Sequence, residues 1–179
     1  MNRVGKLATA VGATAVLLGA GSVALAASPA SQPKGGKVRV FVTNTSPTKG
    51  KILITGAIGD YGTNVSEDAN GKVDPNGNYE KVKLRHGGFI VNTTALNKKL
   101  SHLVPTVNKT NCSIVVSGRG PVTVGSGTRS YAGISGKVTI TVTFAGIAKK
   151  TAKGCDFAEN APTRGQYQSI TGTGSVSFK

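Results

Sequence analysis

Residues 137–144 read Lys-Val-Thr-Ile-Thr-Val-Thr-Phe, the most regular alternation in the chain. Its four apolar side chains, from Val138 to Phe144, alternate strictly with Lys137 and three threonines. A period of two places apolar groups on one face of a β-strand and hydroxyl groups on the other. The stretch therefore predicts a half-buried strand of an antiparallel sheet.

The same alternation recurs on both sides of this stretch, between turn-forming clusters of Asp, Asn, Ser and Gly such as Asp68–Gly71, Asp74–Gly77 and Ser117–Gly120. Only Thr94–Leu103 has leucines at helical spacing, which predicts one short helix. Eight strands are predicted, at or around Val38–Val42, Ile52–Ile58, Asn78–Leu84, Gly88–Thr94, Cys112–Ser117, Pro121–Val124, Lys137–Phe144 and Ser169–Phe178.

Short strands with one apolar face each predict an all-β protein, and we expect an eight-stranded antiparallel β-barrel. Closure into a barrel removes the unpaired edges that an open sheet of such strands would present. A β-sandwich is the alternative, because alternation alone does not separate the two architectures.

The first residues predict export. Arg3 and Lys6 precede an uncharged apolar run from Leu7 to Leu25, and Ala24-Leu25-Ala26 fits signal peptidase. We expect a Sec-type signal peptide of bacterial character over residues 1–26, a flexible linker over 27–36 and a single barrel domain over 37–179, secreted from the cell. A transmembrane anchor is the alternative for the apolar run.

Two cysteines, Cys112 and Cys155, lie in the predicted mature chain. Because exported proteins fold under oxidising conditions, we expect these two residues to form a disulfide. Two unpaired buried thiols are the alternative. No C-x-x-C pair is present, so neither redox catalysis nor a zinc site is indicated.

The connection before the strand predicted at residues 137–144 reads Gly127-Thr-Arg-Ser-Tyr131-Ala-Gly133-Ile-Ser-Gly136. It resembles the G-T-G-x-aromatic-x-G-x-x-G connection of the allene oxide cyclase and dirigent-like barrels. The resemblance implies an eight-stranded barrel and, for its catalytic members, a hydrophobic substrate held inside. The chain departs from the family at Arg129, where a third Gly is preferred; an Arg there is strained if the position requires a positive φ.

No motif for a hydrolase nucleophile, a phosphate-binding loop or a zinc protease occurs, and no cofactor is expected.

His86 and His102 are interpreted as surface residues. Acidic side chains gather between Asp60 and Asp74; their spacing does not fit a calcium loop, and bonding to their own turns explains them better. Asp60 and the adjacent Tyr61 are the only catalytic candidates, on the assumption that they lie at the mouth of the barrel. A turn aspartate is the alternative for Asp60.

The chain carries 22 Lys and Arg against 7 Asp and Glu, a formal charge of +15. Loss of residues 1–26 removes Arg3 and Lys6 and no acid, which leaves +13. Three basic residues at every second position of a predicted strand share one of its faces: Lys81, Lys83 and Arg85. They are the candidate surface for an anionic partner such as an envelope polymer or lipid. A solvated basic surface is the alternative; nucleic acid is not expected, because few aromatic side chains accompany the charges.

Two functions remain from different classes. The first is non-catalytic binding, either of a small apolar ligand or of anionic envelope material. The second is a cyclase or isomerase of the allene oxide cyclase and dirigent type. Polar residues inside the barrel would favour the enzyme. The parities that face inward in the predicted strands hold Val, Ile, Phe and Gly, so the sequence favours binding.

Overall fold

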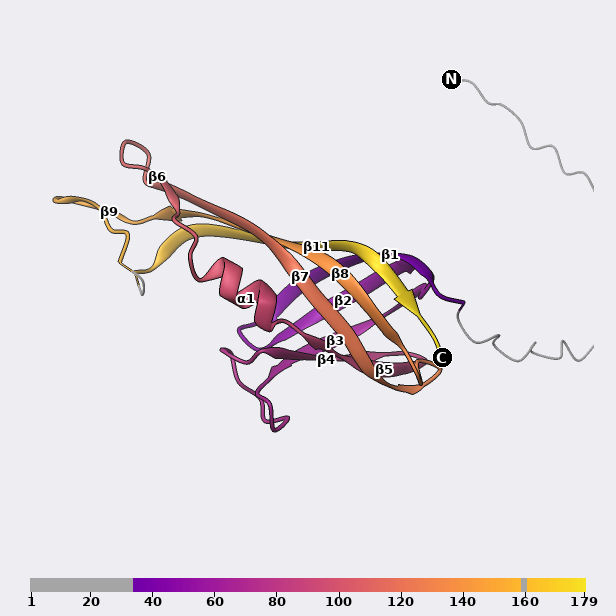
Figure 1. Ribbon diagram of the computed structural model, residues 1–179. Coiled ribbons are helices and arrows are strands. Elements are labelled where there is room, and N and C mark those ends of the chain that lie inside the picture. The colour runs from indigo at the N-terminus through magenta and orange to yellow at the C-terminus, as the bar shows by residue number, and fades with distance from the viewer. Residues whose placement is uncertain (1–33, 159–160) are drawn as a thin grey trace, which may run out of the picture. The chain divides into compact units, whose positions relative to one another are not determined.

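The computed structural model describes residues 34–158 and 161–179. The predicted signal peptide, and the predicted linker as far as residue 33, lie outside these ranges. Within them, eight antiparallel strands close into a barrel in the order β1-β2-β3-β4-β5-β7-β8-β11, and β11 pairs with β1 (Figure 1). The predicted barrel is confirmed, and the sandwich alternative is wrong because the β5–β7 pairing closes the sheet.

One helix and three short strands accompany the barrel strands. In the described ranges, no helix has the length and hydropathy needed to cross a membrane. The elements are β1 Gly36–Ser46, β2 Lys49–Gly56, β3 Asp60–Glu67, β4 Tyr79–Leu84, β5 Gly87–Asn92, α1 Thr94–Leu100, β6 Thr106–Asn108, β7 Ser113–Arg129, β8 Ser135–Ala148, β9 Lys150–Thr151, β10 Gly154–Cys155 and β11 Thr163–Ser177.

The predicted number of barrel strands is right, but two of their positions are wrong. No strand is predicted at β3, because its inward side chains include the polar Asn64 and Ser66, which hide the alternation. The predicted turn at Ser117–Gly120 also divides β7 in two. The chain is continuous there, and Gly118 serves packing instead: a Cβ on it would lie 2.6 Å from Leu100 of α1.

The core is the inward row of aliphatic side chains around the barrel. Val138 and Ile140 of β8 are buried, as the alternation in residues 137–144 predicts, and Val38, Ile54 and Val82 meet them from β1, β2 and β4. Full burial of each such side chain contributes about 1.5–3 kcal/mol. The helix adds Leu96, which is also buried.

One end of the barrel is closed by the connection between β7 and β8, the segment that resembles the allene oxide cyclase and dirigent-like barrels. Tyr131 of this connection is 1% exposed and packs edge-on against Phe89, with the rings 5.8 Å apart. Gly127 is required there because a Cβ would collide with the Tyr131 carbonyl, and Gly133 because its φ is +73°. The remaining glycine of the motif, Gly136, lies in β8 opposite Val176.

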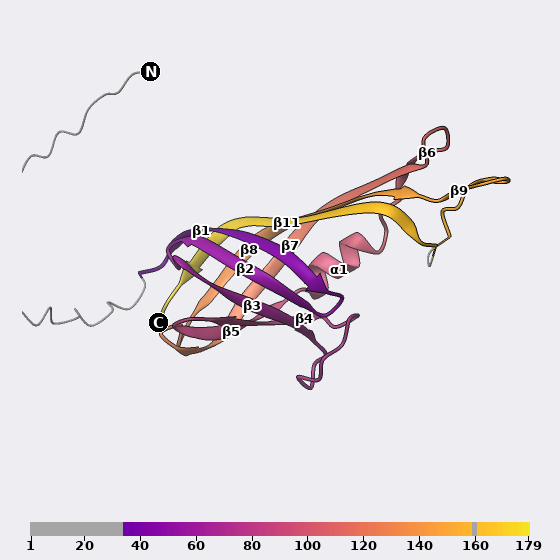
Figure 2. The same cartoon turned by 180° about the vertical axis from the view of Figure 1, so that it is seen from behind.

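At the other end, β7, β8 and β11 continue beyond the other barrel strands as an extension, visible from both sides in Figures 1 and 2. Strand β6 pairs along the β7 edge of this extension. The helix α1 packs against β7, where Leu96 and Leu100 cover Gly120 and Gly118. The extension and α1 therefore flank the end of the barrel opposite Tyr131.

Candidate ligand-binding lumen

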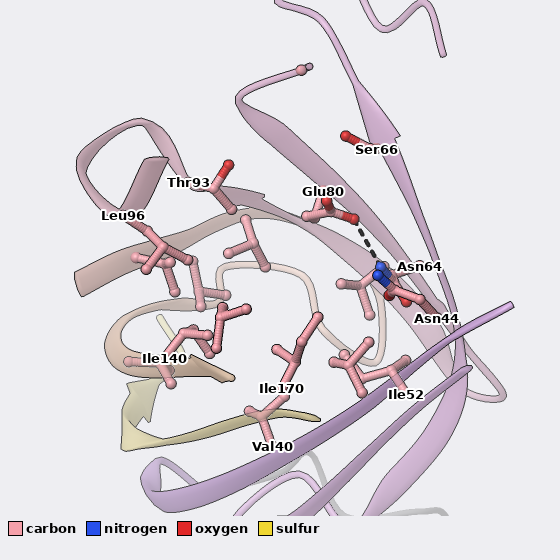
Figure 3. A pocket seen from close by; sticks show the side chains of 18 of the residues that line it. Val40, Asn44, Ile52, Asn64, Ser66, Glu80, Thr93, Leu96, Ile140 and Ile170 are labelled. Atoms are coloured by element: carbon pink, nitrogen blue, oxygen red, sulfur yellow. Dashed lines mark hydrogen bonds between the residues drawn. The ribbon is translucent and has the colours of Figure 1, made fainter. Parts of the chain in front are cut away.

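The interior of the barrel holds a cavity of about 360 Å³. Every barrel strand contributes to its wall, which is mostly aliphatic, with Val40, Ile52, Ile140 and Ile170 among the residues drawn in Figure 3. The cavity opens at the end opposite Tyr131, because the β1–β2 turn at Pro47 and residues of α1 also line it. Its volume lies within the range of small-molecule pockets in proteins.

A polar group of side chains lies at the open end of the cavity. The Asn64 amide Nδ2 donates a hydrogen bond of 2.8 Å to Glu80 Oε2 across β3 and β4 (Figure 3). Nearby, Asn44 Nδ2 donates to Gln168 Oε1 at 3.1 Å. All four residues line the cavity, so one end of an otherwise apolar lumen offers hydrogen-bonding groups to an occupant.

The Glu80 carboxyl is held in an unusual environment. Burial raises its pKa, the nearby Glu67 carboxylate adds to the rise, and hydrogen bonds from Asn64 and Ser66 oppose it. Glu67 is itself buried and pairs with Lys81 on the outer face, at 3.5 Å. The electrostatic surroundings of Glu80 therefore favour its neutral form more than water does.

The inward positions are not confined to the predicted Val, Ile, Phe and Gly, because Glu80 also lines the lumen. Its strand was predicted, but its neighbour β3 was not, so neither Asn64 nor the pair with Glu80 was foreseen. The signal that was available is the alternation Glu80, Val82, Leu84, which places Glu80 on the same face as two buried aliphatic residues.

Asp60 and Tyr61 do not lie at the mouth of the lumen. Asp60 is 3% exposed and lies at the closed end, where its Oδ2 accepts hydrogen bonds from the Tyr131 hydroxyl at 2.7 Å and the His86 N–H at 3.1 Å. The side chain of Tyr61 faces outward, with the Arg85 guanidinium 5.3 Å from its ring centre. Neither residue lines the cavity, so they do not form a catalytic pair for a substrate held there.

The closed end has its own charge pattern. His86 Nδ1 lies 3.1 Å from Asp60 Oδ2 while most of the imidazole is exposed, as predicted for a surface histidine. Burial raises the pKa of Asp60, but the hydrogen bonds from Tyr131, Tyr61 and His86 together outweigh burial and lower it. Burial and the neighbouring Asp60 carboxylate both raise the pKa of the Tyr131 phenol. The hydrogen bond between Tyr131 and Asp60 stabilises the closed end of the barrel, so Asp60 has a structural role there.

Arg129, which replaces the third Gly of the family connection, adopts a φ of +54°. This is the left-handed conformation, which is unfavourable for residues other than glycine. Arg129 is therefore strained, as expected if the position requires a positive φ.

The three candidate cations share the outer face of β4, because Val82 and Leu84 between them are buried. They differ in their surroundings, since Lys81 pairs with Glu67 and Arg85 lies over Tyr61. Lys83 is exposed and lies opposite Thr63, whose other neighbour across the sheet is Lys51. Two lysines thus flank a threonine on the outer wall.

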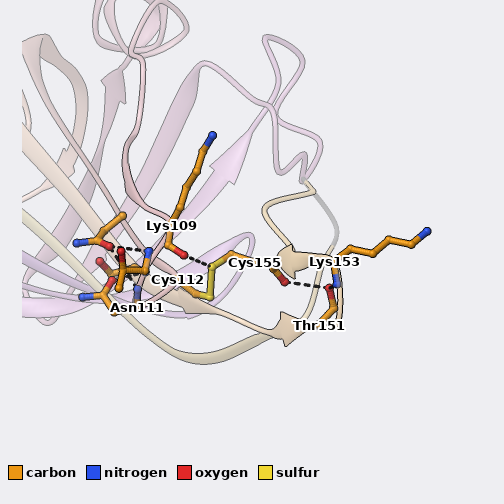
Figure 4. Close-up of a disulfide and its surroundings, with 10 residues drawn as sticks. Lys109, Asn111, Cys112, Thr151, Lys153 and Cys155 are labelled. Atoms are coloured by element: carbon orange, nitrogen blue, oxygen red, sulfur yellow. Dashed lines mark hydrogen bonds between the residues drawn. A yellow bond between two sulfur atoms is a disulfide. The ribbon is translucent and has the colours of Figure 1, made fainter.

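The disulfide between Cys112 and Cys155 is present, as predicted (Figure 4). It joins the start of β7 to β10 at the far end of the extension, and Cys155 Sγ lies 3.1 Å from the Lys109 carbonyl oxygen. A disulfide indicates that the protein folds in an oxidising environment.

The acidic residues of the β3–β4 hairpin bond to their own turns, as predicted. Asp68 Oδ1 accepts hydrogen bonds from the N–H groups of Asn70 and Lys72, and Asp74 Oδ1 accepts one from Asn76. In residues 34–158 and 161–179, no three His, Cys, Asp or Glu side chains are grouped so as to hold a metal ion.

Comparisons of the chain with protein-family models, with curated proteins and with solved structures found no match. The resemblance to the allene oxide cyclase and dirigent-like barrels therefore stays a prediction that rests on residues 127–136 and on the shared architecture.

Proposed function

We propose that this protein is a secreted β-barrel that binds a small, predominantly apolar molecule in its lumen without transforming it. The observation that carries the proposal is the cavity of about 360 Å³ with an aliphatic wall, open at one end and closed at the other by Tyr131. Burial of an apolar ligand against such a wall contributes about 25 cal/mol for each Å² removed from water.

Secretion is part of the proposal. The basic start and uncharged run of residues 1–26 support it, and so does the Cys112–Cys155 disulfide, which needs an oxidising compartment. Extracellular proteins that carry apolar molecules must shield them from water, and a closed barrel does so without exposing sheet edges.

The test is a titration of the mature protein with N-phenyl-1-naphthylamine, an uncharged apolar dye that fluoresces in apolar surroundings. We expect saturable binding that Val142→Phe weakens at least tenfold, because Val142 lines the cavity. Val115→Phe is the matched control, since Val115 is exposed on the extension. Absence of saturable binding, or equal effects of the two substitutions, would show that the lumen is not the binding site.

A cyclase or isomerase is the second candidate, and Glu80 is the observation that favours it. A carboxyl group with a raised pKa that lines an apolar cavity has the environment of a general acid or base. This candidate requires that Glu80→Gln abolish turnover of a small apolar substrate while dye binding persists.

Binding of anionic envelope material through the outer wall is a third property that the charge supports. The exposed Lys51 and Lys83, two strands apart, supply a fixed pair of cations for it. This property is compatible with a ligand in the lumen, because the two surfaces face opposite ways.

A further inference from the structure

The polar end of the lumen holds a hydrogen-bond acceptor that has no partner in the protein. Asn64 is nine-tenths buried, and its Nδ2 is engaged by Glu80 Oε2. Its Oδ1 is buried without any hydrogen-bond partner. A buried carbonyl oxygen without a hydrogen-bond partner is unfavourable, so an occupant of the cavity that donates to it would be favoured.

Glu80 adds a negative charge at the same place. Lys49 is the one basic residue among those that line the cavity. Among the described residues, the ion pairs are Lys81 with Glu67 and His86 with Asp60, so neither Lys49 nor any other cation is paired with the Glu80 carboxylate. Asn44, the neighbouring amide on β1, points its Oδ1 toward Gly50, as does Asn64. A carboxylate and two amide oxygens thus gather at one end of an aliphatic cavity.

The wider charge pattern acts in the same direction. Four of the seven acidic residues of the chain, Glu67, Asp68, Asp74 and Glu80, lie on β3, β4 and the hairpin between them. Pro75 and Gly77 of this hairpin line the opening of the lumen. A protein with a formal charge of +15 therefore carries most of its negative charge beside the mouth of its cavity.

We propose that the ligand of the lumen is a cationic amphiphile: an apolar body that ends in an amine, with its ammonium group donating to Glu80 and to Asn64 Oδ1. This inference rests on the proposed function, because it specifies the ligand class of the same cavity. An ammonium group carries three donors and no acceptor, which matches the Glu80 carboxylate and the unpartnered Asn64 Oδ1. Its charge also removes the cost of a carboxylate without a partner.

The test is displacement of bound N-phenyl-1-naphthylamine at pH 7 by four ten-carbon compounds: decylamine, decanol, decane and decanoate. Decylamine is expected to displace the dye at a concentration at least tenfold lower than decanol, and decanoate to be the weakest. If decanol or decanoate is the best competitor, or if all four act alike, the proposed ligand class is wrong although the binding function stands. If the dye itself does not bind, the binding function fails instead.

Glu80→Gln identifies the group responsible. It keeps the hydrogen bond from Asn64 and removes the charge, so the preference for decylamine over decanol is expected to fall at least fivefold while decanol binding is unchanged. Asp74→Asn is the matched control, because it removes the same charge from the hairpin without altering the lumen. An equal loss of preference in Asp74→Asn would mean that the general field, and not contact with Glu80, selects the amine.

Discussion

Asp60 and Tyr131 link the stability of the closed end of the barrel to pH. The folded protein lowers the pKa of Asp60 below its ordinary 3.8 and raises that of Tyr131 above its ordinary 10.0. A lowered acid pKa gives stability that is present above the unfolded value and is lost as pH falls through the folded value. A raised pKa gives stability that is complete below the unfolded value and is lost as pH rises. The pair therefore stabilises the fold between about pH 4 and pH 10.

Tyr131→Phe tests this pair. Removal of the hydroxyl leaves the buried Asp60 carboxylate with one donor fewer, so the free energy of unfolding at pH 7 is expected to fall by about 1–3 kcal/mol. The loss of stability above pH 10 is expected to become shallower, because the phenol that titrates there is gone. Urea unfolding from pH 3 to pH 11 measures both effects. Tyr61→Phe, at an exposed tyrosine, is the control and should retain the alkaline loss.

Arg129 provides a second prediction at this scale. A non-glycine residue in the left-handed region costs about 1–2 kcal/mol, and glycine loses about 0.5–1 kcal/mol of conformational freedom on folding. Arg129→Gly is therefore expected to stabilise the protein by up to about 1 kcal/mol, measured by urea unfolding. Arg119→Gly, in the middle of β7, should instead destabilise it by about 0.5–1 kcal/mol. Destabilisation by both substitutions would contradict strain at Arg129.

At the scale of the elements, the strands that could be predicted are those whose inward residues are aliphatic. Residues 137–144 are a clear case, since every second side chain is apolar and all lie within β8. Strand β3 could not be found in this way, because two of its inward positions, which line the cavity, are polar. Asn64 and Ser66 occupy these positions. The polar end of the lumen was missed for the same reason.

The extension shows a different limit. Its length depends on pairings between residues far apart in the chain, such as Val116 with Phe144 and Phe144 with Gln168. The alternation of apolar and polar residues describes each strand alone. It does not indicate over how many residues two neighbouring strands stay paired. The glycines at 118 and 120 indicate a turn in the sequence, whereas in the structure they are the positions on β7 that Leu100 and Leu96 of α1 approach closely.

The disulfide at the end of the extension is expected to stabilise the whole β7–β8 hairpin, since Cys112 and Cys155 are 43 residues apart and enclose both strands. For a loop of this length, chain entropy predicts about 4 kcal/mol, and native disulfides typically contribute 2–4 kcal/mol. The double variant Cys112→Ser, Cys155→Ser should lose about this much in urea unfolding. Wild-type protein treated with a reductant should show the same loss; unchanged midpoints in both would place the disulfide outside the cooperative unit.

At the scale of the whole molecule, the acidic cluster and the Lys51–Lys83 pair lie on different surfaces. Acidic residues gather at the mouth of the lumen, whereas the outer wall of β2, β3 and β4 presents Lys51 and Lys83 with Thr63 between them. Strands lie about 4.8 Å apart, so the two ammonium groups are anchored about 10 Å from each other on a rigid wall. A rigid pair loses less conformational entropy on binding than lysines on a loop do.

This separation predicts where the mature protein meets an anionic surface. Co-sedimentation with vesicles that contain phosphatidylglycerol should be strong at low salt and should fall steeply by 0.5 M salt, because screening shortens electrostatic reach to well below 8 Å. Lys51→Glu with Lys83→Glu should weaken binding more than Lys149→Glu with Lys150→Glu, which makes the same charge change at exposed residues of the extension. Equal effects would mean that net charge alone drives binding, and insensitivity to salt would exclude an electrostatic partner. Dye binding in the lumen should be unchanged in all four substitutions, because none of them alters the aliphatic wall.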